Sequence, residues 1–195
     1  MRESNIKRET HETKINLSLA LDESDPNLTI HTGVGFFDHM LTLFAAHGKL
    51  DLSLNADGDT FVDDHHTVED VGIVLGQAVK EAVGDKRGIT RYGHAYTPMD
   101  ESLSLVALDL SNRPFLVYDV ADLPEKIGDF DSELVEEFLR AFSTHAGITL
   151  HVKLIHGKNS HHIVESIFKG LGRAIRTAIT VEEGNQSIPS TKGSL

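Results

Sequence analysis

One short stretch of this chain occurs twice, and the repetition restricts what the sequence can fold into. Residues 64–70 read Asp-His-His-Thr-Val-Glu-Asp, and residues 160–166 read Ser-His-His-Ile-Val-Glu-Ser. Both copies follow the pattern His-His-x-x-Glu and continue into apolar residues at helical spacing. When residues 65–84 are aligned with 161–180, the identities also include Leu75, Gly76, Ala78 and Ala82. The repetition indicates an internal duplication that carries a metal site.

The composition limits the metals that such a site could hold. The chain has 12 histidines and no cysteine, so disulfides and cysteine-ligated zinc or iron–sulfur sites are excluded. The ligands must then be imidazole and carboxylate groups, which suit manganese, iron, zinc or nickel. The formal net charge of -12 argues against general nucleic-acid binding, because that depends on a basic surface.

The length of 195 residues fits one domain or two fused half-domains. Residues 1–10 are too polar for a signal peptide, and the apolar runs are far shorter than the roughly 20 residues of a membrane span. We therefore expect a single cytoplasmic domain over 1–195 with no membrane partner. Its half-domains are predicted at roughly 5–92 and 93–185, followed by a C-terminal tail at 186–195.

Helical geometry predicts that each motif serves two ions. Neighbouring residues lie about 100° apart around a helix with 3.6 residues per turn, so His65 and His66 diverge. Glu69 shares a face with one of them, because residues three or four apart are neighbours on a helix. Two motifs facing each other would supply four imidazoles and two carboxylates to a dinuclear site. The alternative is a pair of solvated, polar helix starts without a ligand.

A shorter helix that precedes each motif is also repeated. When residues 39–47 are aligned with 137–145, three residues agree, so that Leu41, Phe44 and His47 correspond to Leu139, Phe142 and His145. The same alignment sets His39 against Glu137. Both side-chain types bind metals, so we predict one further ligand per half, with coordination positions left open for a substrate. In the alternative, His39 is a helix-start histidine and Glu137 is a surface glutamate.

The hydrophobic pattern predicts an α+β fold. Strands are predicted where apolar residues alternate, over 10–22, 50–54, 103–110, 115–120 and 148–154. Residues 28–32 are predicted to form a hairpin with the strand at 10–22. Helices are predicted over 37–47, 66–83 and 161–180, and from a cap at Ser132 through Phe142. Each half reads strand, strand, helix, strand, helix, with the place of one further strand left open. Hairpins dominate over β-α-β alternation, which favours α+β.

Several cationic residues lie in loop-like contexts and could bind an anion. They are Arg91, Arg113 and Lys192, and Lys169 follows Glu165 by one helical turn. Arginine and lysine side chains suit phosphate. By position alone, solvated surface charge is the favoured interpretation of each of them.

Four segments of the chain resemble imidazoleglycerol-phosphate dehydratases, and the similarity runs from about residue 5 to the end. They are Gly-Phe-Phe-Asp-His-Met (35–40), Asp-Asp-His-His-Thr-Val-Glu-Asp (63–70), Asn-Ser-His-His-Ile-Val-Glu (159–165) and Pro-Ser-Thr-Lys-Gly (189–193). The resemblance implies a hydro-lyase of histidine biosynthesis that converts D-erythro-imidazole glycerol phosphate to imidazole acetol phosphate. It also implies two manganese ions per active site, four-stranded sheets packed on a helical layer, and 24 subunits built from trimers.

Carried over by position, the resemblance assigns a role to each motif residue. The implied metal ligands are His39, His65, His66, Glu69, His161, His162 and Glu165. Plant members have histidine where this chain has Glu137, so the eighth ligand position is open. The implied substrate contacts are Glu12, the 39–47 helix with His39 and His47, Arg91, Arg113, Ser190, Thr191 and Lys192, and Lys169 would join the phosphate group. Residues 186–195 would therefore form a substrate-binding tail.

The chemistry of the reaction explains why such a site needs two metals. The proton on C2 has no adjacent carbonyl, so the imidazole ring of the substrate is the only electron sink. A ring held at both nitrogens becomes an imidazolate, which expels the C3 hydroxyl through a diazafulvene-like intermediate. A carboxylate then takes the C2 proton. Glu12 is the candidate, and a metal-bound glutamate, Glu69 or Glu165, is the alternative.

Two other functions use the same residues. A dinuclear-metal hydrolase of a phosphorylated small molecule would keep the ligands and the cationic groups. A non-catalytic metal store would keep the ligands but would not need Arg91, Arg113 and Lys192.

Overall fold

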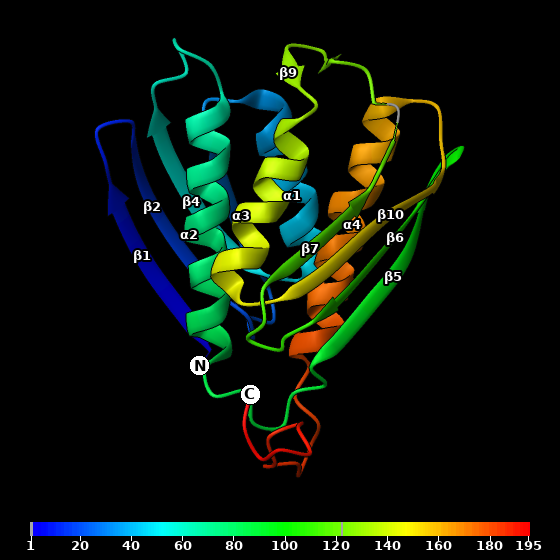
Figure 1. Cartoon of the computed structure of the whole chain (residues 1–195). Coiled ribbons are helices and arrows are strands. Elements are labelled where there is room, and N and C mark those ends of the chain that lie inside the picture. Colours follow the sequence, from blue (N-terminus) through cyan, green and yellow to red (C-terminus); the bar gives the residue numbers. More distant parts are fainter. Residues whose placement is uncertain (1, 122) are drawn as a thin grey trace.

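The computed structural model describes residues 2–121 and 123–195, which form two large β-sheets with a layer of helices between them (Figure 1). The first half contains β1 (Glu3–Glu9), β2 (Thr13–Ala20), β3 (Leu28–His31), α1 (Gly35–Gly48), β4 (Asp51–Gly58) and α2 (His65–Val83). The second half contains β5 (Tyr92–Met99), β6 (Ser102–Asp109), β7 (Phe115–Asp119), β8 (Lys126–Ile127), β9 (Phe130–Asp131), α3 (Leu134–Ala146), β10 (Thr149–His156) and α4 (Ser160–Ile179). The predicted α+β class is confirmed.

Both large sheets have the same connectivity. The first has the strand order β1-β2-β4-β3, and the second has the order β5-β6-β10-β7. Strand β4 is antiparallel to β2 and parallel to β3, just as β10 is antiparallel to β6 and parallel to β7. Leu17 pairs with Leu54 in the first sheet, and Val106 pairs with Val152 in the second. The duplication is therefore present in the topology as well as in the sequence.

The core lies between the helices and the inner faces of the sheets. Strand β2 buries every second residue, Ile15, Leu17 and Leu19, because side chains alternate across a strand. The helices add fully buried phenylalanines, with Phe138 stacked on Phe168 at 5.3 Å between ring centroids. Burial of such side chains stabilises the fold by about 1.5–3 kcal/mol each.

Glycines bring the helices of each pair into backbone contact. Helix α2 packs on α3, and α4 packs on α1. A Cβ added at Gly76 of α2 would lie 2.6 Å from the carbonyl oxygen of Phe142, and one at Gly172 of α4 would lie 2.2 Å from that of Phe44. These two contacts are equivalent in the duplication, so both halves dock their helices in the same way.

One prediction about the strands is wrong, and the further strand whose place was left open in each half is β1 or β5. Residues 28–32 do not form a hairpin with β2, because β3 pairs in parallel with β4, which lies between them in the sheet. The sequence pattern indicates no position for β1 and β5. The inner face of β5 consists of small residues, including Gly93 and Ala95, because α4 packs so closely that a Cβ on Gly93 would lie 1.9 Å from the Ala174 carbonyl oxygen. Such a face carries no hydrophobic alternation.

The helix boundaries agree with the sequence pattern except at one cap. Helices α1, α2 and α4 lie within one or two residues of their predicted ranges. Helix α3 begins at Leu134 and has no side-chain cap, because the Ser132 hydroxyl donates instead to the Pro124 carbonyl. In the described part of the chain, no helix is long and apolar enough to cross a membrane.

The glycine contacts predict a matched effect on stability in the two halves. Gly76→Ala and Gly172→Ala should each lower the free energy of unfolding by about 1–3 kcal/mol, because a methyl group pushes apart two helix backbones. Gly35→Ala is the control, since a Cβ there has no atom within 4 Å. Urea denaturation measures all three. A variant at Gly76 or Gly172 as stable as the control would contradict the close packing.

Candidate metal centre and anion pocket

The second motif forms a cluster with a histidine from the first half of the chain. His161 and Glu165 lie on α4, and His39 lies near the start of α1. Both histidines place Nε2 close to the same carboxylate oxygen, Oε2 of Glu165, at 3.0 Å for His161 and 3.6 Å for His39. Among the described residues, these are the only three His, Asp or Glu side chains whose ligand atoms all lie within 4.8 Å of one another.

Glu165 is an ionised carboxylate in a nearly closed environment. Its side chain is only 8% exposed. Burial raises its pKa, but the hydrogen bond and charge of Lys169 and the bond to His161 together lower the pKa below its ordinary value. Lys169 Nζ lies 2.5 Å from Oε1, which leaves Oε2 toward the two histidines. Two imidazoles and a buried carboxylate with a free oxygen are a fitting donor set for manganese or a similar ion.

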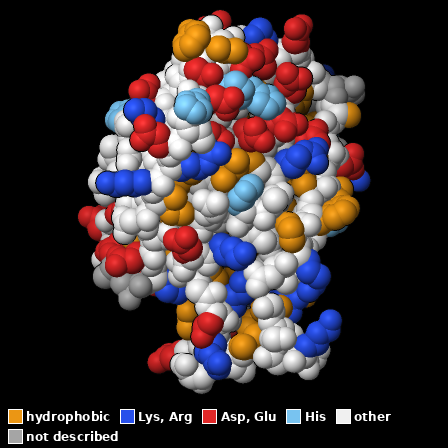
Figure 2. Space-filling view, turned by 60° about the vertical axis from the view of Figure 1, so that its left-hand side comes forward, with side chains coloured by type: hydrophobic (Ala, Val, Ile, Leu, Met, Phe, Trp, Pro, Cys, Tyr) orange, Lys and Arg blue, Asp and Glu red, His pale blue; other side chains and the backbone are white. Residues whose placement is uncertain are grey.

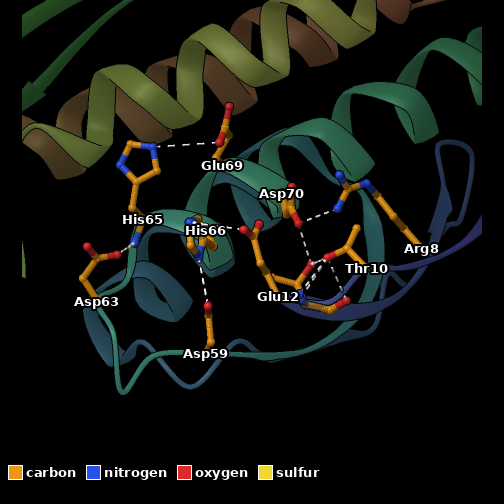
Figure 3. Close-up of polar contacts among 10 residues, drawn as sticks. Arg8, Thr10, Glu12, Asp59, Asp63, His65, His66, Glu69 and Asp70 are labelled. Carbon is orange, nitrogen blue, oxygen red and sulfur yellow. Dashed lines mark hydrogen bonds and ion pairs between the residues drawn. The ribbon is translucent and has the colours of Figure 1, made fainter.

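The first motif is built around the start of α2 (Figure 3). His65 Nε2 lies 3.8 Å from Glu69 on the next turn of the helix. His66 points the other way, with Nδ1 3.0 Å from Asp59 and Nε2 3.6 Å from Glu12. Glu12 comes from the β1–β2 turn, where its backbone N–H donates to Thr10 and its carbonyl accepts from the Asp59 N–H.

The paired histidines diverge as helical geometry predicts. The rings of His65 and His66 are 6.3 Å apart at an interplanar angle of 86°, and those of His161 and His162 are 6.4 Å apart at 85°. In the second motif, the Asn159 side chain accepts hydrogen bonds from the backbone N–H groups of both histidines and caps the helix. Each motif therefore presents its two imidazoles in different directions.

The two motifs do not face each other within one chain, so the predicted pairing of motifs would need a second copy of the chain and stays a prediction. Helices α2 and α4 lie on opposite sides of the helical layer, with α3 and α1 between them (Figure 1). Each motif helix is packed against its own sheet, which holds the two motifs apart. A single chain thus carries two separate half-sites.

Glu137 stays a prediction. It lies on α3, half-buried, and no ion pair or side-chain hydrogen bond of its carboxylate is seen among the described residues. The equivalent glycine contacts place α3 against α2 as α1 is placed against α4. In the duplication, Glu137 therefore corresponds to His39, as Glu69 corresponds to Glu165.

The predicted anion-binding residues meet in one pocket at the other end of the molecule. The pocket lies between two arginines and the C-terminal tail. Its lining residues are Arg91, Tyr92, Arg113, Pro189, Ser190, Thr191, Lys192, Ser194 and Leu195. Asp109 receives two bonds from Arg91, at 2.7 and 3.0 Å, and lies 3.5 Å from Arg113. Arg91 also donates to the Pro189 carbonyl. Asp109 and the tail thus hold two guanidinium groups toward one cavity.

The anion pocket and the metal residues lie at opposite ends of α4. The Arg91 backbone N–H donates to the Ala178 carbonyl, near the end of this helix, whereas His161 lies at its start. A rise of 1.5 Å per residue separates these positions by roughly 25 Å. Figure 2 shows acidic and histidine side chains gathered at the end of the molecule away from the C-terminal tail. No phosphorylated metabolite of modest size would reach both regions of one chain.

Lys169 and His47 lie apart from the anion pocket of the same chain. Lys169 pairs with Glu165, as described. His47 lines a groove on the surface of α4 with Arg173 and Arg176. Burial and the positive charges of Lys169 and Arg173 lower the pKa of His47.

Sequence reasoning missed Asp59, Glu101, Asp109 and Lys86. The first three are carboxylates that hold a predicted histidine or arginine, and nothing in the spacing singles them out. Lys86 lies beneath the anion pocket, 4% exposed, and its ammonium donates to the Leu110 carbonyl and the Asn112 amide oxygen at 2.8 and 2.7 Å. It ties down the loop that carries Arg113.

Burial of Lys86 predicts a pH-dependent effect on stability. Burial lowers its pKa from 10.5 to about 8, so between these values the unfolded chain binds more protons and the wild type gains stability as pH rises. Lys86→Met should cost about 1–3 kcal/mol, because two buried acceptors lose their donor. Chemical denaturation should show the difference from wild type growing between pH 8 and 10.5. Lys7→Met, on an exposed position, is the control, and a pH-independent difference would contradict the burial argument.

Comparisons with known proteins identify the family. Residues 32–175 match the family model described as Imidazoleglycerol-phosphate dehydratase. The chain is 59% identical over 195 residues to the imidazoleglycerol-phosphate dehydratase of Streptococcus thermophilus and 56% identical to that of Oceanobacillus iheyensis, with all of each chain covered.

Solved structures agree with this result. A crystal structure of imidazoleglycerol-phosphate dehydratase from Staphylococcus aureus is 45% identical with a TM-score of 0.83, covering 92% of this chain and 99% of that one. A structure of IGPD from Pyrococcus furiosus in complex with (S)-C348 is 38% identical with a TM-score of 0.85, covering 97% and 100%. The chain therefore belongs to the imidazoleglycerol-phosphate dehydratase family, the dehydratases of histidine biosynthesis.

Proposed function

We propose that the chain removes water from D-erythro-imidazole glycerol phosphate to give imidazole acetol phosphate, with two manganese ions in a site shared between subunits. The family supports the dehydratase activity. The observation that carries the metal assignment is the convergence of His39, His161 and Glu165 around one buried carboxylate oxygen. Nitrogen and oxygen donors without sulfur suit manganese.

The ligands come from both half-sites of the chain. Those that would hold the ions are His39, His65, His66, Glu69, His161, His162 and Glu165, with Glu137 as the candidate eighth. When bound, the two ions would supply Lewis-acid stabilisation of the negative charge that develops on the imidazole ring of the substrate. The divergent histidines of each motif support two ions, because neither pair can close around one.

Glu12 is the proposed proton-transfer group. Its carboxylate lies 3.6 Å from Nε2 of His66, a predicted ligand atom, and is about half exposed. The reaction breaks the C3–O and C2–H bonds. The C3 hydroxyl gains a proton and leaves as water, and Glu12 then takes the proton from C2, which balances the proton that the hydroxyl gained. The enol that forms tautomerises to the ketone. The fixed backbone of the β1–β2 turn restricts where this carboxylate can reach. Glu69 or Glu165 is the alternative base.

The anion pocket would hold the phosphate of the substrate. Arg91 and Arg113 present planar forks that match phosphate oxygens, and the tail adds Ser190, Thr191 and Lys192. Lys169 and His47, on the face of α4 and α1 next to the metal residues, would contact the substrate from the other side. A glycerol phosphate placed between metals and pocket must therefore bridge two chains.

Separation of the half-sites supports an oligomer, which we propose to be 24 subunits built from trimers. The loop before the first motif exposes Phe61 and Val62 by 90% and 59%. Apolar side chains beside a half-site are suited to contact with a second copy. We further propose a cytoplasmic location, as for other enzymes that act on small metabolites.

A direct assay tests the reaction and the metal together. Metal-stripped protein should form no ketone from imidazole glycerol phosphate, and added Mn²⁺ should restore the activity. Glu12→Gln should then lower kcat by about 10²–10⁴-fold at unchanged metal content, because it removes a general base. Release of inorganic phosphate in place of the ketone would identify a hydrolase, and bound metal without turnover would identify a metal store.

Mixing two impaired variants, assayed at a substrate concentration well below the raised KM, tests whether the site is shared. Arg113→Ala should raise KM with metal retained, and Glu69→Gln should lower the metal bound per chain. Chains of the two variants refolded together in equal amounts should recover about a quarter of the wild-type activity, because random assembly in a symmetric oligomer gives that share of sites both intact residues. Arg140→Ala, an exposed arginine paired with Glu136, is the control. No recovery would place Glu69 and Arg113 of one chain in the same site.

A further inference from the structure

In each motif, the Nδ1 atom of the second histidine lies within hydrogen-bond distance of a carboxylate from outside the motif. His66 Nδ1 lies 3.0 Å from Asp59, which follows β4, and His162 Nδ1 lies 2.8 Å from Glu101, in the turn between β5 and β6. Asp59 contacts His66 through both of its oxygens, at 3.1 and 3.0 Å. Figure 3 shows Asp59 on the opposite side of the His66 ring from Glu12.

The two carboxylates occupy positions that are not equivalent in the duplication. Aligning β2 with β6 by their central pairs, Leu17 on Val106, places Glu12 on Glu101, each one residue before its strand. Strands β4 and β10 align Leu54 on Val152, but the register of β10 shifts between Leu154 and His156, so Gly58 falls on Gly157 and Asp59 on Lys158. The duplication therefore predicts a carboxylate at 158, where this chain has a lysine.

The second half exchanges the carboxylate for one on another loop. The preceding glycine is equally crowded in both halves, since a Cβ would lie 2.1 Å from Thr67 Oγ1 at Gly58 and 2.6 Å from Ser102 Oγ at Gly157, and the next residue is Asp59 in the first half and Lys158 in the second. Glu101 takes over the contact with the histidine. It is fixed by the backbone N–H groups of Lys158 and Asn159 and by the Ser102 hydroxyl. Within the described part of the chain, the carboxylate of its counterpart Glu12 has no such set of donors, and in that half Asp59 contacts the Nδ1 of His66 instead.

We propose that Asp59 and Glu101 are positioning residues that fix the tautomer and orientation of His66 and His162. The inference rests on the proposed metal-binding function. An ionised carboxylate only accepts hydrogen bonds, so the neutral imidazole carries its proton on Nδ1 and presents the Nε2 lone pair to a metal. A carboxylate behind a ligating histidine also raises its basicity. Because Asp59 orients His66 whereas Glu101 itself orients His162, Glu12 is free for proton transfer and Glu101 is not.

Two isosteric substitutions test the positioning role in metal-free protein. The side-chain amide in Asp59→Asn or Glu101→Gln can donate to Nδ1, which moves the ring proton to Nε2. ¹⁵N NMR of the neutral histidines should show the Nδ1–H tautomer for His66 and His162 in the wild type. Each variant should change the tautomer of its own partner only. An unchanged tautomer in both variants would overturn the proposal.

Metal titration tests the consequence without an activity assay. Calorimetric titration with Mn²⁺ should show affinity about 10–100-fold weaker in each variant. Asp57→Asn and Glu133→Gln, which remove exposed carboxylates, are matched controls for the lost charge and should bind like the wild type. Variant affinity within twofold of the controls would overturn the proposal.

The design separates failure of the inference from failure of the proposed function. A wild type that binds no Mn²⁺ would refute the metal-dependent function, whereas the tautomer measurement would still decide whether the carboxylates orient the histidines. Glu101 also holds two backbone N–H groups, so its variant is checked by circular dichroism. Among the residues that the structure describes, the Asp59 carboxylate contacts only His66, and Asp59→Asn decides the question if the Glu101 variant does not fold.

Discussion

The close approach of α4 to α1 is the contact on which the candidate centre depends. Gly172 lets the α4 backbone meet the carbonyl of Phe44, and two turns earlier the same approach places His39 beside Glu165. A larger residue at 172 would push the helices apart and separate the imidazole from the carboxylate. Because interiors are packed as densely as organic crystals, such a displacement cannot be absorbed locally. The equivalent contact at Gly76 gives the other half-site the same framework.

The ionisable side chains are gathered in two regions that differ in the sign of their charge. Acidic and histidine side chains occupy the starts of α2 and α4, whereas arginines and the tail occupy the far end of α4. In each region the functional charge is balanced locally, by Lys169 on Glu165 and by Asp109 on Arg91. A buried charge that has lost its partner is strongly destabilising, so these pairs keep each half-site ordered before the other is brought to it.

The two halves agree in framework and differ in chemistry. Strand order and helix contacts repeat, yet His39 corresponds to Glu137, and Asp59 corresponds to Lys158. An asymmetric substrate gives a physical reason for such differences, because its ring nitrogens, hydroxyls and phosphate need different partners. Sites grafted on a repeated fold can diverge while the packing that holds them stays fixed.

The sequence by itself determined the α+β class, most helix boundaries, the duplicated motif and the divergence of its histidines, because helical and strand periodicities are local properties of the chain. The tertiary structure alone decided that β3 pairs in parallel with β4, that β5 carries a small-residue face, and that the two motifs lie apart. It also decided which carboxylates contact the Nδ1 atoms of His66 and His162. Strand pairing and the contacts of Asp59, Glu101 and Asp109 join residues that are distant in sequence, and only the packing of whole sheets and helices brings them together.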